Sequence, residues 1–179
     1  MKTLTIVLTT LAILGLTTTA SAQIPAAPEH AVFKDDVGVW DAEIKAWEGP
    51  GEPTITKGTE TNRMLGDYWQ ISNFEGKLFG FNFKGHGVYG YDTEKKIYTG
   101  TWIDSLGSTK MIMTGKHDKE AKKMTYTGMA LGPDGKQAKH TLTTQRNADG
   151  TRVMTMHVGE GENAFKMMEI KTTKRAEKK

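Results

Sequence analysis

The sequence predicts an all-β domain: an up-and-down antiparallel barrel of about ten strands, with a short helix before it. After Gly38, segments of about 8–12 residues rich in Thr, Tyr, Met, Val and Ile alternate with clusters of Gly, Pro, Asp and Asn. No segment between Gly38 and Lys174 has a 3.6-residue apolar period over about 11 residues. Without crossover helices the strands should run antiparallel, and closing the sheet removes its two edges. A flat sandwich is the alternative architecture.

The first 22 residues match a cleavable signal peptide. Lys2 precedes an apolar run from Leu4 to Leu16, and Ala20-Ser21-Ala22 before Gln23 has the A-x-A spacing of a cleavage site. The apolar run is shorter than the roughly 20 residues that a membrane-spanning helix needs. We therefore expect export, to the periplasm or out of the cell, with no membrane span after cleavage.

The rest of the chain is expected to form one domain. Residues 23–36 are predicted to be a linker and a short helix, 37–175 the barrel, and 176–179 a frayed basic tail. Pro28 suits the first turn of that helix. The connections between strands are expected near Gly49–Pro53, Gly66–Asp67, Gly76–Lys77, Thr93–Lys95, Ser105–Ser108, Asp118–Ala121, Gly132–Lys136, Ala148–Gly150 and Gly159–Asn163.

Composition narrows the possible functions. The 179 residues include no Cys, which excludes thiolate catalysis, iron–sulfur clusters and Cys–zinc sites. Removing Lys2 with the signal peptide lowers the formal net charge from +3 by one. The charge that remains is too small to indicate a nucleic-acid partner. The histidines lack the H-x-H or H-E-x-x-H spacing of a metal site, so neither a metal nor another cofactor is predicted.

Period-2 alternation predicts which side chains face the barrel interior. In the first strand Trp40, Ala42, Ile44 and Ala46 share one face. Because small residues lie on these faces and a ten-stranded barrel is wide, a cavity is expected. The predicted ligand-binding residues are Trp40, Tyr98, Trp102, Asp104, Met111, Met113, Met124, Tyr126, His140, Met154 and Met156.

Several short motifs carry a family resemblance. Gly38-Val39-Trp40, after the short helix, resembles the Gly-x-Trp signature of lipocalin and calycin barrels, whose Trp plugs one end of the barrel. The segments that follow are similar, in their order, to an uncharacterised bacterial family of exported barrels, a domain of unknown function. These segments are Gly90-Tyr91-Asp92, Trp102-Ile103-Asp104-Ser105, Gly115-Lys116-His117-Asp118 and Met168-Glu169-Ile170.

This resemblance covers about Val32 to Arg175. It implies a calycin-like fold and brings no established activity, so no residue role is carried over. The predicted wide barrel, its small and Met-rich inward faces and the lack of a catalytic constellation favour binding of a small, largely apolar ligand.

Three alternatives to binding an apolar ligand stay open. Asp104, His140 or Tyr126 could act as an acid or base in a barrel enzyme, although Asp104-Ser105 lacks the G-x-S-x-G elbow of a hydrolase. The barrel could be a packed structural or interaction module. Met111 with Met113, and Met154 with Met156 beside His157, could bind Cu(I), although flexible methionines that line an apolar interior are the favoured interpretation.

Two further residues need interpretation. His140 is interpreted as a hydrogen-bonded core residue rather than a haem ligand. An inward Asp104 would need a partner such as Arg63, Arg146 or Lys171, because an unpaired buried carboxylate is costly.

The stretch from Gly85 to Gly90 matches the dinucleotide-binding pattern G-x-G-x-x-G. That fingerprint needs a helix after it, whereas Tyr91 and Asp92 lead into a turn and another predicted strand. We therefore expect these glycines to shape the strands of the barrel and not to hold a nucleotide.

Overall fold

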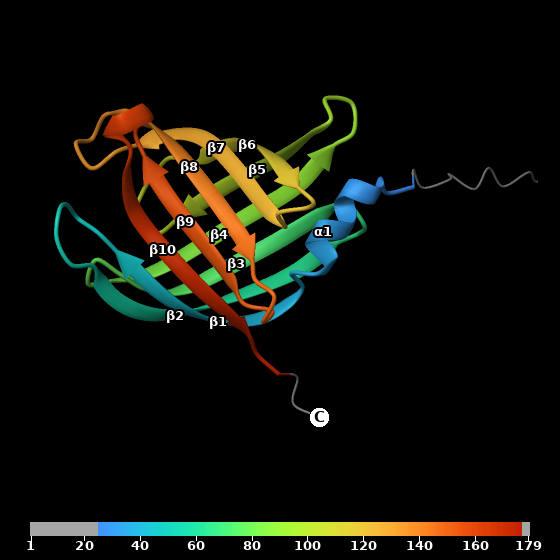
Figure 1. Ribbon diagram of the computed structural model, residues 1–179, viewed down its shortest axis with the longest axis horizontal. Helices are drawn as coiled ribbons and strands as arrows, with labels where there is room; N and C mark the ends of the chain where they lie inside the picture. Colours follow the sequence, from blue (N-terminus) through green and yellow to red (C-terminus); the bar gives the residue numbers. More distant parts are fainter. Residues whose placement is uncertain (1–24, 177–179) are drawn as a thin grey trace, which may run out of the picture.

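The computed structural model describes residues 25–176, which form a closed barrel of ten antiparallel strands with a short helical segment at one end (Figure 1). The predicted signal peptide and its cleavage site at Gln23 lie outside the described residues. Within the described part, no helix is both long and apolar enough to cross a membrane.

The strands follow one another around the barrel in chain order, and the last closes on the first. Ile44 of the first strand is opposite Ile170 of the last, so neither sheet edge is left open. This confirms the predicted up-and-down barrel. The strands are β1 Gly38–Ala46, β2 Thr54–Leu65, β3 Trp69–Leu78, β4 Phe81–Asp92, β5 Ile97–Asp104, β6 Met111–Asp118, β7 Lys123–Leu131, β8 Gln137–Arg146, β9 Arg152–Val158 and β10 Phe165–Lys174.

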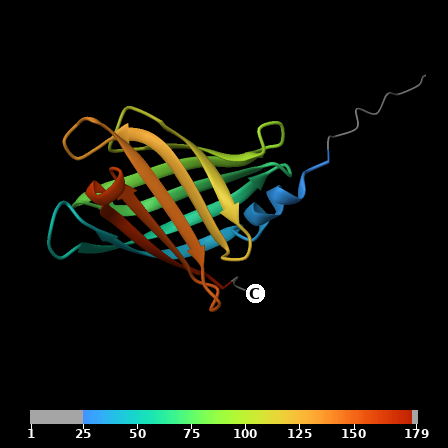
Figure 2. The same ribbon diagram turned by 45° about the horizontal axis from the view of Figure 1, so that its top comes forward.

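The helical segment consists of a 3-10 turn, η1 (Pro28–His30), and one helical turn, α1 (Ala31–Lys34). Both views of the ribbon show this segment across one end of the barrel (Figures 1 and 2). Phe33 anchors it, because its ring is buried edge-on against Tyr98 of β5. So short a helix is not stable by itself, and contacts with the barrel have to hold it in place.

Alternation along the strands produces the core, as predicted. Trp40, Ala42, Ile44 and Ala46 of β1 are all buried. Buried apolar side chains form two groups, one toward the helical segment and one farther from it. The first group is Phe33, Tyr98, Met111, Met113 and Tyr126, and the second is Ala42, Ile44, Ala46, Phe74, Leu78, Phe83, Met156, Met168 and Ile170.

One predicted connection is wrong. Gly76 lies inside β3, and the chain turns instead at Phe79 and Gly80, both of which have positive φ. Gly76 faces Gly58 of β2, and a Cβ on Gly58 would stand 2.8 Å from the ring of Phe74 and 2.8 Å from a main-chain oxygen. These two glycines make room for an aromatic ring. From the sequence alone, a glycine with this role cannot be distinguished from a glycine in a turn.

The G-x-G-x-x-G stretch lies within β4 and is followed by a turn and β5, so it forms no nucleotide-binding loop. A Cβ on Gly85 would lie 2.1 Å from the ring of Trp102, and one on Gly87 would lie 2.5 Å from the ring of Tyr89. The glycines therefore shape the strands by giving aromatic rings space to lie flat against the sheet.

Candidate functional site

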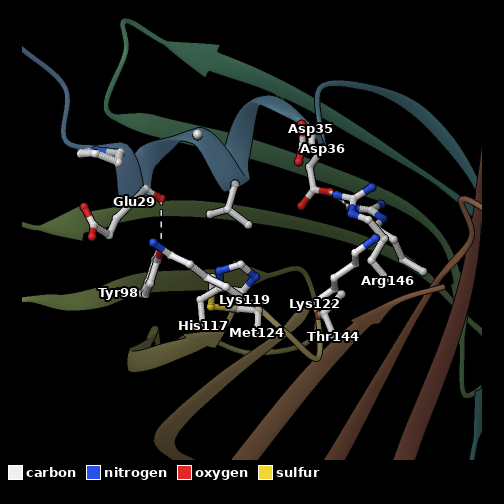
Figure 3. A pocket seen from close by; sticks show the side chains of 14 residues that line it. Glu29, Asp35, Asp36, Tyr98, His117, Lys119, Lys122, Met124, Thr144 and Arg146 are labelled. Carbon is white, nitrogen blue, oxygen red and sulfur yellow. Dashed lines mark hydrogen bonds and ion pairs between the residues drawn. The ribbon is translucent and has the colours of Figure 1, made fainter. Parts of the chain in front are cut away.

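A cleft of about 390 Å³ lies between the helical segment and the adjacent ends of strands β5 to β9 (Figure 3). Its volume falls in the range of small-molecule sites. The residues that line it are Pro28, Glu29, Ala31, Val32, Asp35, Asp36, Tyr98, His117, Lys119, Lys122, Met124, Thr144, Arg146 and Arg152.

One part of the cleft is apolar. Val32 of α1, Met124 and Tyr98 all line the cleft, and Val32 and Met124 pack against the buried group that contains Tyr98. The Tyr98 hydroxyl donates a hydrogen bond to the main-chain oxygen of Glu29 at 3.1 Å, which ties the helical segment to β5. This wall can take the hydrocarbon part of a ligand.

The floor of the cleft holds a carboxylate between two guanidinium groups. Asp36, just after α1, is ion-paired with Arg146 of β8. The same Asp36 oxygen lies 3.2 Å from Nη1 of Arg152 on β9. Figure 3 shows Arg146 reaching from the strand side toward Asp36 on the helix side.

Arg152 is the centre of a buried polar cluster, with only 5% of its surface exposed. Its Nη2 donates to Glu60 at 3.1 Å, and its Nε donates to the Thr172 hydroxyl at 3.1 Å. Its guanidinium also lies 3.7 Å from the ring centroid of Trp40, within the distance of a cation–π contact. Burial with this many partners makes Arg152 a fixed part of the barrel.

Two buried polar atoms have no hydrogen-bond partner within the described part of the chain. They are Oδ1 of Asn62 and the hydroxyl of Tyr126. The Asn62 amide uses its other end to donate to Glu60 at 2.5 Å. Buried polar groups are nearly always paired, so each such atom calls for an explanation.

Burial raises the pKa of two tyrosines near the cleft. Desolvation, together with the charge of Glu29, raises the pKa of Tyr98 to about 12. Burial likewise raises the pKa of Tyr126 well above its ordinary value, and Tyr89, Tyr98 and Asp36 add to the increase. At neutral pH these phenols therefore offer a hydrogen to an acceptor.

His117 and two lysines form the outer edge of the cleft on the strand side. Burial and the positive charge of Lys119 lower the pKa of His117, so its imidazole is neutral at neutral pH. Lys119 and Lys122 lie in the turn between β6 and β7, and neither has an ion pair among the described residues. The charged residues that line the cleft on the strand side are all positive, whereas Asp118 and Glu120 of the same hairpin are not among the lining residues.

Of the predicted ligand-binding residues, the structure places Tyr98 and Met124 in the cleft. The others lie elsewhere in the barrel wall and core. Trp40, Met111, Met113, Tyr126, His140 and Met156 are buried, and Trp102, Asp104 and Met154 are partly buried.

Asp104 and His140 each have local partners. The Asp104 carboxylate accepts hydrogen bonds from the indole of Trp102 at 3.1 Å and from the main-chain N–H of Leu106 at 2.9 Å. Of its three suggested cationic partners, Arg146 pairs with Asp36 instead. The His140 ring lies 3.1 Å from the main-chain oxygen of Ala138, in keeping with a hydrogen-bonded core histidine.

The methionines do not form a single cluster. Met111, Met113 and Met124 belong to the group near the helical segment, whereas Met154 and Met156 belong to the other. Among the described residues, no group of three His, Asp or Glu side chains could hold a metal ion.

Sequence reasoning missed the charged floor of the cleft. Arg146 and Arg152 flank the turn at Asp149 and Gly150, and they are opposite each other in the β8–β9 pair. Alternation along β8 places Arg146 on the same face as Thr144 and Leu142. That parity was a signal for an inward arginine, but nothing in the sequence linked it to Asp36.

Comparison with known proteins gives a fold and a family. The crystal structure of Rv2717c from M. tuberculosis has a TM-score of 0.62 and 9% sequence identity, covering 85% of this chain and 100% of that one. At that identity the likeness concerns the fold alone. No curated protein matches the chain. The family model described as "Protein of unknown function (DUF1579)" matches residues 25–174, nearly all of the described barrel, and the chain therefore belongs to this family.

Proposed function

We propose that this protein is a small-molecule-binding barrel and that the cleft under the helical segment is its binding site. The observation that carries the proposal is the cleft itself, about 390 Å³ with an apolar wall and a few fixed polar groups. Buried aromatic and methionine side chains pack together in the barrel interior next to the cleft. The ligand therefore belongs at the mouth of the barrel rather than along its axis.

The hydrocarbon part of the ligand is expected to contact Val32, Met124 and the ring of Tyr98. A methionine suits this position because its unbranched side chain adapts to ligands of different shape. The helical segment would cover the bound ligand, since its one helical turn and 3-10 turn are held by a few contacts such as the Tyr98 hydrogen bond to Glu29.

The experiment is a fluorescence titration with N-phenyl-1-naphthylamine, an uncharged aromatic probe that brightens in apolar surroundings. Thr144 lines the cleft, so Thr144→Trp should fill it and weaken binding at least about tenfold. Thr141→Trp is the matched control, because Thr141 lies on the same strand with the opposite parity. The proposal fails if the probe does not bind, or if the two variants bind it equally well.

We further propose that the protein is exported and acts outside the cytoplasm, on the basis of the signal-peptide pattern in residues 1–22.

A further inference from the structure

We propose that the ligand of the cleft carries an oxyanion, which binds Arg146 in place of the Asp36 carboxylate and accepts a hydrogen bond from the Tyr126 hydroxyl. The ligand class is thus an amphipathic acid, such as a carboxylate or sulfonate on a hydrocarbon frame. This inference rests on the proposed function, since it names the chemistry of the ligand in the same cleft.

The first observation is that the cleft floor already holds an oxyanion. The Asp36 carboxylate is bound by Arg146 and lies 3.2 Å from Arg152. Arg152 has further partners in Glu60 and Thr172, whereas Asp36 is the only side chain in the described structure that bonds the guanidinium of Arg146. A ligand oxyanion that replaces Asp36 on Arg146 can therefore leave Asp36 in its ion pair with Arg152.

The planar guanidinium of Arg146 suits this exchange. It has five N–H donors in a fixed fork that matches the two oxygens of a carboxylate or sulfonate. The ion pair with Asp36 joins one carboxylate oxygen to one nitrogen of the guanidinium, and Arg146 lines the cleft. Donors therefore remain for a ligand that enters beside Asp36 and then displaces it.

The second observation is the unpaired hydroxyl of Tyr126. Its side chain is 92% buried, its ring lies over Gly115, and the hydroxyl has no partner among the described residues. Tyr126 does not line the cleft itself but belongs to the same buried group as Tyr98, against which Val32 and Met124 pack, and these three residues line the cleft. Met124 packs in the same group and is the flexible side chain that would move aside.

This hydroxyl can donate a hydrogen bond to an anionic ligand. A phenol is protonated at neutral pH, and burial raises the pKa of Tyr126 further above its ordinary value. An oxyanion provides only acceptors, and hydrogen bonds with a charged partner are the stronger kind. A ligand of this class gives the hydroxyl a partner that residues 25–176 do not provide.

The charges around the cleft agree with this orientation. Lys119 and Lys122 on the strand side have no ion pair within the described residues and would attract an anion from solution. Glu29 and Asp35 line the helix side, as Figure 3 shows. The oxyanion is therefore expected against the strands, with the hydrocarbon part under Val32.

The test compares two probes with the same aromatic frame. The anion 8-anilino-1-naphthalenesulfonate carries a sulfonate, and N-phenyl-1-naphthylamine does not. Both are titrated against the protein by fluorescence and by calorimetry. We expect the sulfonate to bind about tenfold more tightly and to displace the neutral probe.

Three variants give different results if the inference holds. Arg146→Gln should weaken sulfonate binding at least about tenfold and change neutral-probe binding less than about twofold. Asp36→Asn should tighten sulfonate binding several-fold, because it removes the competing carboxylate. Tyr126→Phe should weaken sulfonate binding without lowering the melting temperature of the free protein, since its hydroxyl has no partner to lose.

Matched controls account for the change in net charge. Lys139 and Glu160 form an ion pair of 3.0 Å at the other end of the barrel. Lys139→Gln and Glu160→Gln change the charge as Arg146→Gln and Asp36→Asn do, and neither should alter binding of either probe more than about twofold.

The outcomes separate the two proposals. If neither probe binds, the proposed function and this inference both fail. If both probes bind equally and none of the three variants alters sulfonate binding, the inference fails and the proposed function stands. If Asp36→Asn weakens sulfonate binding, the carboxylate does not occupy the oxyanion position and the inference is wrong. Should Arg146→Gln fail to fold, Asp36→Asn and Tyr126→Phe decide the result.

Discussion

Trp40 joins three parts of the molecule at one end of the barrel. Its indole N–H donates to the main-chain oxygen of Asp36 at 2.8 Å, and its ring contacts the guanidinium of Arg152. Only 1% of its surface is exposed. A single side chain thus packs the core, positions the start of β1 next to the helical segment and supports the arginine at the floor of the cleft.

Trp40→Ala should lower the free energy of unfolding by about 3–5 kcal/mol, as truncation of a large buried aromatic side chain does. The variant also leaves Arg152 without its aromatic contact. Urea unfolding followed by circular dichroism measures the change. Trp69→Ala is the control, because Trp69 is 43% exposed on β3 and should cost under about 1 kcal/mol. Equal losses from the two variants would contradict this account of Trp40.

At the scale of strands, aromatic rings pack directly against glycines, at positions where a Cβ would collide with the ring. Gly58 of β2 and Gly76 of β3 are opposite each other, next to the ring of Phe74. Glycine inside a strand normally weakens it, so its presence here reflects a close approach of other atoms. The same pairing recurs where the ring of Trp102 lies over Gly85.

Gly58→Ala should lower the free energy of unfolding by about 1–3 kcal/mol, as overpacking of a core does. The added methyl would stand 2.8 Å from both the Phe74 ring and the main-chain oxygen of Glu75, and a main-chain atom cannot move aside easily. Chemical denaturation measures the loss. Gly107→Ala, where a Cβ would meet nothing within 4 Å, should leave stability nearly unchanged. A harmless Gly58→Ala would show that the strands can separate at this point.

At the scale of the whole molecule, closure of the sheet brings distant segments together at the helical end. The pairing of β1 with β10 closes the barrel, and β8 and β9 bring Arg146 and Arg152 toward the segment after α1. The cleft depends on this arrangement, because its helix side comes from residues 28–36 and its strand side from β5 to β9, much later in the chain.

Export is the prediction that concerns the chain as a whole. When the full-length gene product is expressed in a bacterium with an intact secretion pathway, the mature protein should begin at Gln23. Cell fractionation followed by N-terminal sequencing and intact-mass measurement checks this. Ala22→Arg should block processing, because Ala22 is the last residue of the A-x-A pattern. Ser21 occupies the x position of that pattern, so a change there, such as Ser21→Pro, does not test it. Mature protein that retains Met1 outside the cytoplasm would contradict the prediction.

The sequence by itself determined the architecture, because strand structure depends on local patterns. Alternation in β1 identified Trp40, Ala42, Ile44 and Ala46 as core residues. Turn residues located all but one of the connections. The exception is Gly76, which lies inside a strand beside the ring of Phe74, and the sequence does not distinguish such a glycine from one in a turn. Absence of a helical period and the pressure to cover sheet edges then favoured a closed barrel.

Only the tertiary structure decided where the candidate site lies. Asp36 and Arg146 are 110 residues apart in the chain, and no local pattern relates them. They meet because the register of ten strands places the β8–β9 turn under the helical segment. The candidate cleft lies at the mouth of the barrel, where the helical segment meets the strands, and aromatic rings such as those of Trp102 and Tyr89 lie over glycines of the wall. Alternation along a strand predicts whether a side chain faces the barrel interior or the solvent. Which residues it meets across the barrel depends on closure of the sheet and on packing.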